Sequence, residues 1–89
     1  MPELTGHTRT PRRALAYYRE SLARVGETVP AEFLQQMSGD LGIHGRFTEL
    51  VELTEPHFTP EVHGLQVGNN LIKANIELGH LRRARQILN

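Results

Sequence analysis

The sequence contains no cysteine, which excludes disulfide frameworks, thiolate metal sites and cysteine nucleophiles. It also lacks a long apolar run, because no stretch approaches the ~20 residues that a membrane-spanning helix requires. The N-terminal segment MPELTGHTRTPRR has no apolar core of the kind found in signal peptides. We therefore expect a soluble, cytoplasmic protein that does not interact with membranes.

Residue patterns typical of catalysis or metal binding are missing as well. No serine stands in a nucleophile elbow, and no glycine-rich phosphate loop is present. Glu49, Glu52 and Glu55 are interpreted as a solvated helix edge and not as a protected acid–base pair. No two histidines have the four-residue spacing of helical metal ligands, and four of the five fall in predicted loops, turns or the tail. They are His7, His44, His57, His63 and His80. We expect no enzyme activity, no cofactor and no metal ion.

Net charge is also absent, since ten basic residues balance ten acidic ones. The charges are nevertheless unevenly distributed along the chain. Residues 1–26 carry five Arg against two Glu (+3), residues 27–64 one Arg against seven acids (−6), and residues 65–89 four basic residues against one Glu (+3). This pattern does not favour nucleic-acid binding, which requires a continuous basic surface. Solvated helix faces would explain it, and so would attraction between copies of the chain.

Apolar residues recur at helical spacing, and no segment alternates with the two-residue period of a strand. Two helix starts carry the same signal, a threonine followed by proline at the first helical position: Thr10 with Pro11, and Thr59 with Pro60. The short connections predict that consecutive helices are antiparallel. We predict a disordered tail at 1–10 and one domain at 11–89, with helices at about 11–25, 30–43, 46–55, 60–78 and 80–89.

The predicted helices show an internal repeat. A shift of 34 residues aligns Gly45 with Gly79 and Phe47 with Leu81. A unit of about this length, made of a helix, a tight turn and a second helix, is typical of helical repeat arrays.

The chain resembles the tetratricopeptide repeat (TPR) family. The resemblance is carried by LGHLRRARQIL at 78–88, which is similar to the family's Leu-Gly turn and following helix, and by AYYRESL at 16–22. HGRFTELVEL at 44–53 fits less well, because Leu50 replaces the expected small residue.

Two residues of the fourth predicted helix also depart from the TPR pattern. Gly68 replaces a large residue, and Asn75 stands where the family often has tyrosine. The resemblance implies an all-α fold over residues 11–89, in which antiparallel hairpins stack as a right-handed superhelix of about two and a half repeats. A generic antiparallel helical bundle is the alternative.

The TPR resemblance further implies a concave groove, lined by the first helix of each hairpin, that binds a segment of a partner protein or peptide. Polar side chains on the second and fourth predicted helices are candidates to bond an extended backbone: Gln35, Gln66, Asn69, Asn70 and Lys73. We do not predict a carboxylate clamp, because Glu77 follows Lys73 by one turn and would repel an anion. A plain solvated face is the alternative interpretation.

The last predicted helix is short and amphipathic. Leu81, Ala84, Ile87 and Leu88 share one face, and nothing after Asn89 covers that face. The alternative function is therefore structural self-association, in which these residues form a homodimer or join the rest of a longer repeat protein.

Overall fold

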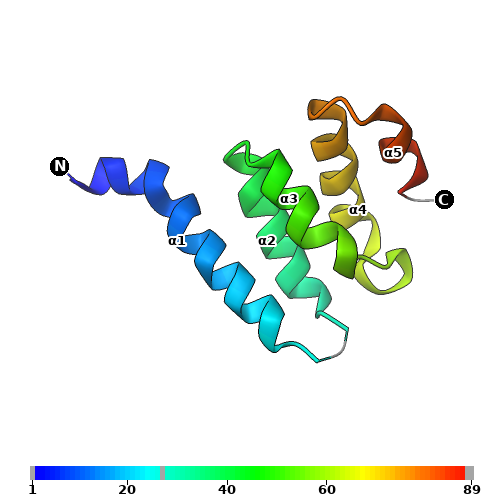
Figure 1. The fold of residues 1–89 in the computed structure, drawn as a ribbon, viewed down its shortest axis with the longest axis horizontal. Helices are drawn as coiled ribbons and strands as arrows, with labels where there is room; N and C mark the ends of the chain where they lie inside the picture. The colour runs from blue at the N-terminus through cyan, green and yellow to red at the C-terminus, as the bar shows by residue number, and fades with distance from the viewer. Residues whose placement is uncertain (1, 27, 88–89) are drawn as a thin grey trace.

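The computed structural model describes residues 2–26 and 28–87, with side chains from residue 12 onward. Within these ranges the fold is all-helical and contains no strand, as predicted. Five α-helices and one short 3₁₀ helix follow one another along the chain (Figure 1). They are α1 (Pro2–Arg24), α2 (Ala31–Ile43), α3 (Phe47–Thr54), η1 (Glu55–His57), α4 (Pro60–Glu77) and α5 (Leu81–Gln86).

The start of the first helix differs from the prediction, because α1 begins at Pro2 instead of Pro11. The backbone of residues 2–10, expected as a separate tail, is part of this helix. A proline is tolerated at the first helical position because its missing N–H would have no partner there. Pro2 is also suited to a first helical position, but no threonine precedes it in the sequence, and our interpretation selected Pro11.

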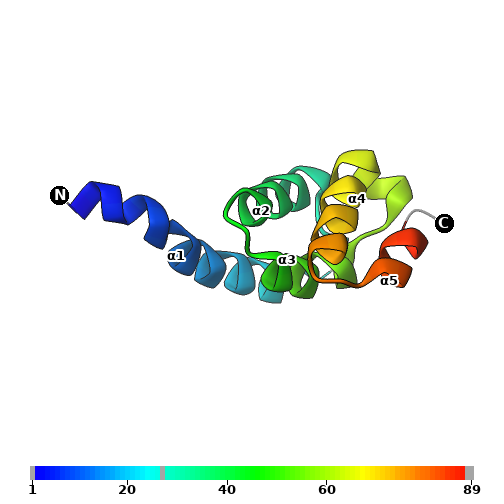
Figure 2. The same ribbon diagram turned by 90° about the horizontal axis from the view of Figure 1, so that it is seen from above.

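The helices form two layers. Consecutive helices run in alternating directions, as the short connections predicted (Figure 1). Seen from above, α2 and α4 lie in one layer, whereas α1, α3 and α5 lie in the other (Figure 2). The molecule measures 46 × 31 × 17 Å, so its shortest dimension is only about two helices deep.

Apolar residues at helical spacing form the core between these layers. Leu34, Met37 and Leu41 of α2 are completely buried, and Leu71 of α4 is buried with them. Each such leucine contributes about 1.5–3 kcal/mol when it is removed from water. The packing of α2 against α3 and α4 therefore holds most of the apolar stabilisation of the domain.

α1 is attached to α2 through Tyr18. Its hydroxyl donates a hydrogen bond of 2.9 Å to Asp40 Oδ2, and its ring meets Phe33 edge-on at a centroid distance of 5.9 Å. Burial raises the pKa of the Tyr18 phenol above its ordinary value, and the hydrogen bond to Asp40 and the charge of that carboxylate raise it further. Tyr18 therefore remains a neutral hydrogen-bond donor throughout the physiological pH range.

The turn that opens α4 is held by His63, not by the threonine that the sequence predicted as a cap. Thr59 occupies the N-cap position, but its side chain makes no capping hydrogen bond. Its backbone N–H instead donates to His63 Nδ1 at 2.9 Å, while His63 Nε2 lies 2.7 Å from the Val29 carbonyl oxygen. Because Nδ1 accepts a hydrogen bond, it carries no hydrogen itself. In the neutral ring the hydrogen is therefore on Nε2, which donates it to the Val29 carbonyl oxygen. His63, predicted to belong to a turn, is thus a buried residue that links α4 to the end of the α1–α2 connection.

A buried hydroxyl in α3 makes no hydrogen bond. Thr54 is fully buried, and its Oγ1 has no hydrogen-bond partner among the described residues. Thr54→Val removes this hydroxyl at nearly constant volume and should raise the free energy of unfolding by about 1 kcal/mol. We expect thermal denaturation followed by circular dichroism to show a midpoint about 4–8 °C higher. Thr48→Val on the exposed face of the same helix is the matched control and should leave the midpoint nearly unchanged. Equal midpoints for the two variants would contradict the prediction.

Candidate functional site

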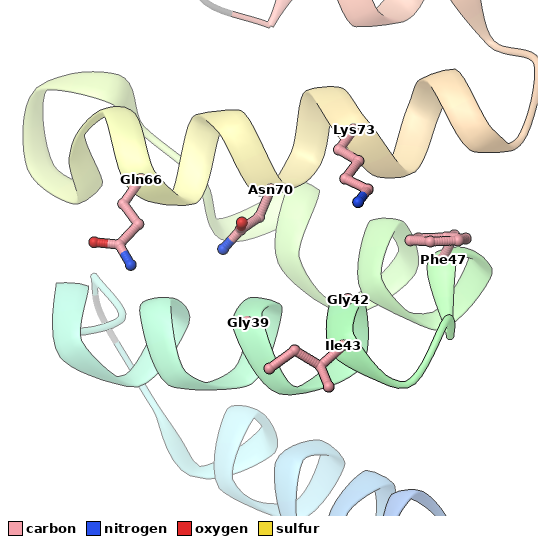
Figure 3. A pocket seen from close by; sticks show the side chains of 7 residues that line it. All are labelled: Gly39, Gly42, Ile43, Phe47, Gln66, Asn70 and Lys73. Carbon is pink, nitrogen blue, oxygen red and sulfur yellow. The ribbon is translucent and has the colours of Figure 1, made fainter.

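A groove of about 300 Å³ opens between α2 and α4 (Figure 3). One wall is α4, the floor is α2, and the first residue of α3 closes one end. The residues that line it are Gly39, Gly42, Ile43, Phe47, Gln66, Asn70 and Lys73. Two helices of the same layer therefore contribute nearly all of the lining.

Two glycines of α2 create the hollow. Gly39 and Gly42 are three residues apart, so both lie on the same face of the helix. No atom outside the local backbone lies within 4 Å of the place where a Cβ of Gly39 would stand. At Gly42 the nearest such atom is Leu50 Cδ1, 3.6 Å away. The missing side chains leave space above the backbone of α2, and this space forms the groove.

The α4 wall is polar. Asn70 Nδ2 donates a hydrogen bond of 2.9 Å to Ser38 Oγ, which fixes the amide across the groove. Gln66 and Lys73 point into the groove from the turns on either side (Figure 3). Neither makes an ion pair or hydrogen bond with any other described residue. Their donors and the Gln66 carbonyl are therefore available to a bound backbone or side chain.

Apolar side chains stand at the end of the groove near α3. Ile43 is 84% exposed, which is unusual for a side chain of this size. Phe47 is partly buried against the core and turns one part of its ring to the groove. The groove thus presents an apolar end next to a cationic and amide-lined wall, a combination typical of binding sites.

The structure brings together three of the five predicted binding residues. Gln66, Asn70 and Lys73 line the groove, whereas Asn69 lies on α4 outside its lining and Gln35 lies on α2 one turn before Gly39. Residues 66, 70 and 73 are spaced by four and three, so they share a helix face that residue 69 only borders. The apolar and glycine residues of the groove were not predicted, although the three-residue spacing of the glycines was a usable signal.

The predicted self-association residues are divided between core and surface. Ala84 and Ile87 are buried at 6% and 7% exposure, with Ile87 in the hydrophobic core of this chain. Leu81 is 59% exposed, and Leu88 lies outside the described residues. The expectation that Ala84 and Ile87 lie on an uncovered face therefore requires correction, because α5 folds back on α4 and covers them (Figure 1).

Two further classes of site were searched for in the part of the chain that the structure describes. None of its helices combines the length and the apolarity needed to cross a membrane. No three histidine, aspartate or glutamate side chains in that part gather closely enough to hold a metal ion.

Comparison of the chain with protein-family models, with curated proteins and with solved structures gave no match. The class of protein that the fold defines is therefore an all-helical domain with a groove between two helices of one layer. Its resemblance to the TPR family stays a hypothesis that rests on the sequence motifs.

Proposed function

We propose that this protein is a protein–protein interaction module that binds an extended segment of a partner in the groove between α2 and α4. Its five helices then form a short TPR-like superhelix, with α2 and α4 as the first helices of successive hairpins. The observation that carries the proposal is the unpaired polar wall of Gln66 and Lys73 above a floor from which side chains are missing. No catalytic step is part of it.

The chemistry of the groove defines the ligand. Amide and ammonium donors on α4 are suited to backbone carbonyls or an acidic side chain of an extended peptide. An apolar side chain of the same peptide would pack on Ile43 and Phe47. The glycine floor allows the peptide backbone to approach α2 closely, because no Cβ atoms separate the two chains at Gly39 and Gly42.

Selection from a phage-displayed library of random peptides tests the proposal without knowledge of the partner. We expect enrichment of sequences with an apolar residue close to an acidic one. Lys73→Glu should weaken binding of the enriched peptides at least about tenfold, because it replaces the only charged lining residue by one of opposite sign. Binding is measured by isothermal titration calorimetry of synthetic peptides.

Arg24→Glu is the matched control, since it makes the same change of charge at an exposed position on α1. It should leave peptide affinity within about twofold of the original. Failure to enrich any peptide, or equal affinities for the Lys73 and Arg24 variants, would contradict peptide binding in this groove.

A further inference from the structure

The outward face of α4 is apolar, which is unexpected for a surface helix. Leu65 is 69% exposed and Ile76 is 50% exposed, while Ile72 between them is partly buried. Together with Asn69 these residues are spaced by four, three and four, so they form one continuous line along the helix. We call this line the α4 stripe: Leu65, Asn69, Ile72 and Ile76.

Leu65, Asn69 and Ile76 of the α4 stripe are exposed on the side of the helix opposite the core, whereas Ile72 is partly buried and also packs against the core. Val67, Leu71 and Ala74 are completely buried, and each follows a stripe residue by two positions, or about 200° around the helix. α4 is therefore apolar on two opposite faces. A helix of this kind is normally covered on both faces, whereas an ordinary surface helix is polar on its outer face. This chain covers only the inner face of α4 fully.

The spacing of the stripe indicates what covers it. Apolar residues alternating by three and four are the heptad pattern of a helix that packs lengthwise against a second helix. The stripe is therefore suited to a helix with the same pattern.

We infer that the α4 stripe is a homodimer interface, in which α4 packs antiparallel against α4 of a second copy. In this register Leu65 lies beside Ile76 of the second copy, and Asn69 lies beside Ile72. The two-fold axis passes between residues 70 and 71, so every contact occurs twice, as an interface between identical surfaces requires. This inference is independent of the peptide groove, which lies on the adjacent face of α4.

Charge selects the antiparallel arrangement. α5 directly follows the end of α4 and carries Arg82, Arg83 and Arg85. Parallel packing would bring two basic α5 helices together, and the resulting repulsion would oppose association. In the antiparallel dimer the two α5 helices are roughly 20 Å apart, well beyond the Debye length of about 8 Å.

A head-to-tail arrangement, with α1 of one copy on the α4 stripe of the next, is disfavoured by the same reasoning. The N-terminal segment at 1–26 and the C-terminal segment at 65–89 both carry a net charge of +3. Such stacking would also generate an open filament instead of a closed dimer.

Sedimentation equilibrium of the full chain at increasing concentration tests the dimer. We expect a dimer at high micromolar concentration, and we expect Leu65→Glu or Ile76→Glu to raise its dissociation constant at least about tenfold, because each places two carboxylates in the apolar contact. Both positions are exposed in the single chain, so circular dichroism should show an unchanged helical content. Tyr17→Glu, which alters a 60% exposed side chain on α1, is the matched control and should leave the dissociation constant unchanged.

Crosslinking then tests the orientation, and the absence of natural cysteine makes it specific. Leu65→Cys mixed with Ile76→Cys should give a covalent dimer with a short bismaleimide, whereas either variant alone should give little. In the antiparallel dimer two copies of the same cysteine are roughly 16 Å apart along the helix.

Three outcomes would overturn the inference. They are a protein that stays monomeric at high micromolar concentration, a dimer that survives both glutamate variants, and efficient crosslinking of Leu65→Cys with itself. None of them bears on peptide binding, which Lys73→Glu tests separately. If the Lys73 variant dimerises with an unchanged dissociation constant, the α4 stripe and the peptide groove are separate surfaces, as their positions on adjacent faces of α4 require.

Discussion

Replacing His63 by alanine is expected to lower the free energy of unfolding by about 3–5 kcal/mol, the largest effect of any single substitution outside the apolar core. The imidazole is 2% exposed and uses both nitrogens, one with the Thr59 N–H and the other with the Val29 carbonyl. Its removal leaves two polar backbone groups without partners and a cavity beside them. A domain of this length has a total stability of roughly 5–13 kcal/mol, so the variant should lose a large share of it.

Urea denaturation followed by circular dichroism measures this effect. His80→Ala is the matched control, because His80 is exposed and makes no side-chain cap at the start of α5. It should change the free energy of unfolding by less than about 0.5 kcal/mol. A loss of less than about 1 kcal/mol for His63→Ala would mean that water replaces both hydrogen bonds, and that His63 does not hold the corner of α4.

The number and type of the helices followed from periodicity, because apolar spacing reports the face that each helix buries. Leu34, Met37 and Leu41 satisfied this pattern on α2 and are fully buried. The pattern fails on α4, where Leu65 and Ile76 have the same apolar character as Leu71 but lie on the opposite face. Periodicity identifies apolar residues without indicating which of them the chain itself covers.

The binding groove was predicted only in part, for a related reason. Gln66, Asn70 and Lys73 could be placed on one helix face from their spacing alone. The depth of the groove depends on Gly39 and Gly42 in the later turns of α2. A glycine shows in the sequence only as a missing side chain, and its effect depends on which helix passes over it. That contact is set by tertiary packing and cannot be inferred from the local sequence.

The terminal helix shows how an assumption about neighbours alters a prediction. Ala84 and Ile87 share a face with Leu81, and we expected this face to be open because the chain ends soon afterwards. Ile87 instead joins the core, whereas Leu81 on the same face stays exposed. The side chain of Arg83 also pairs with Glu55 at the end of α3, so α5 is attached at its polar edge as well.

The second large effect is expected at Gly64, where α4 changes direction. Its backbone has φ 84° and ψ −177°, a conformation that residues with a side chain almost never adopt. Gly64 separates two parts of α4. The first turn is held against Val29 by His63, and the longer part carries Gln66, Asn70 and Lys73. The angle of the groove wall therefore depends on this one residue.

Gly64→Ala should lower the free energy of unfolding by about 1–3 kcal/mol. The cost is conformational, because no atom outside the neighbouring residues and the local helix backbone lies within 4 Å of the position that the new Cβ would take.

Gly39→Ala provides a control of the opposite sign. Its Cβ would also enter open space, but Gly39 lies within the regular part of α2 and has no positive φ. Alanine loses less conformational freedom than glycine on entering a helix, so this variant should gain about 0.5–1 kcal/mol. Parallel urea titrations of the two variants give a difference of about 1.5–4 kcal/mol between substitutions that are chemically identical. If both variants changed the free energy of unfolding in the same direction, a side chain at residue 64 would not strain the backbone there. The bend in α4 would then have to come from the hydrogen bonds of His63 alone.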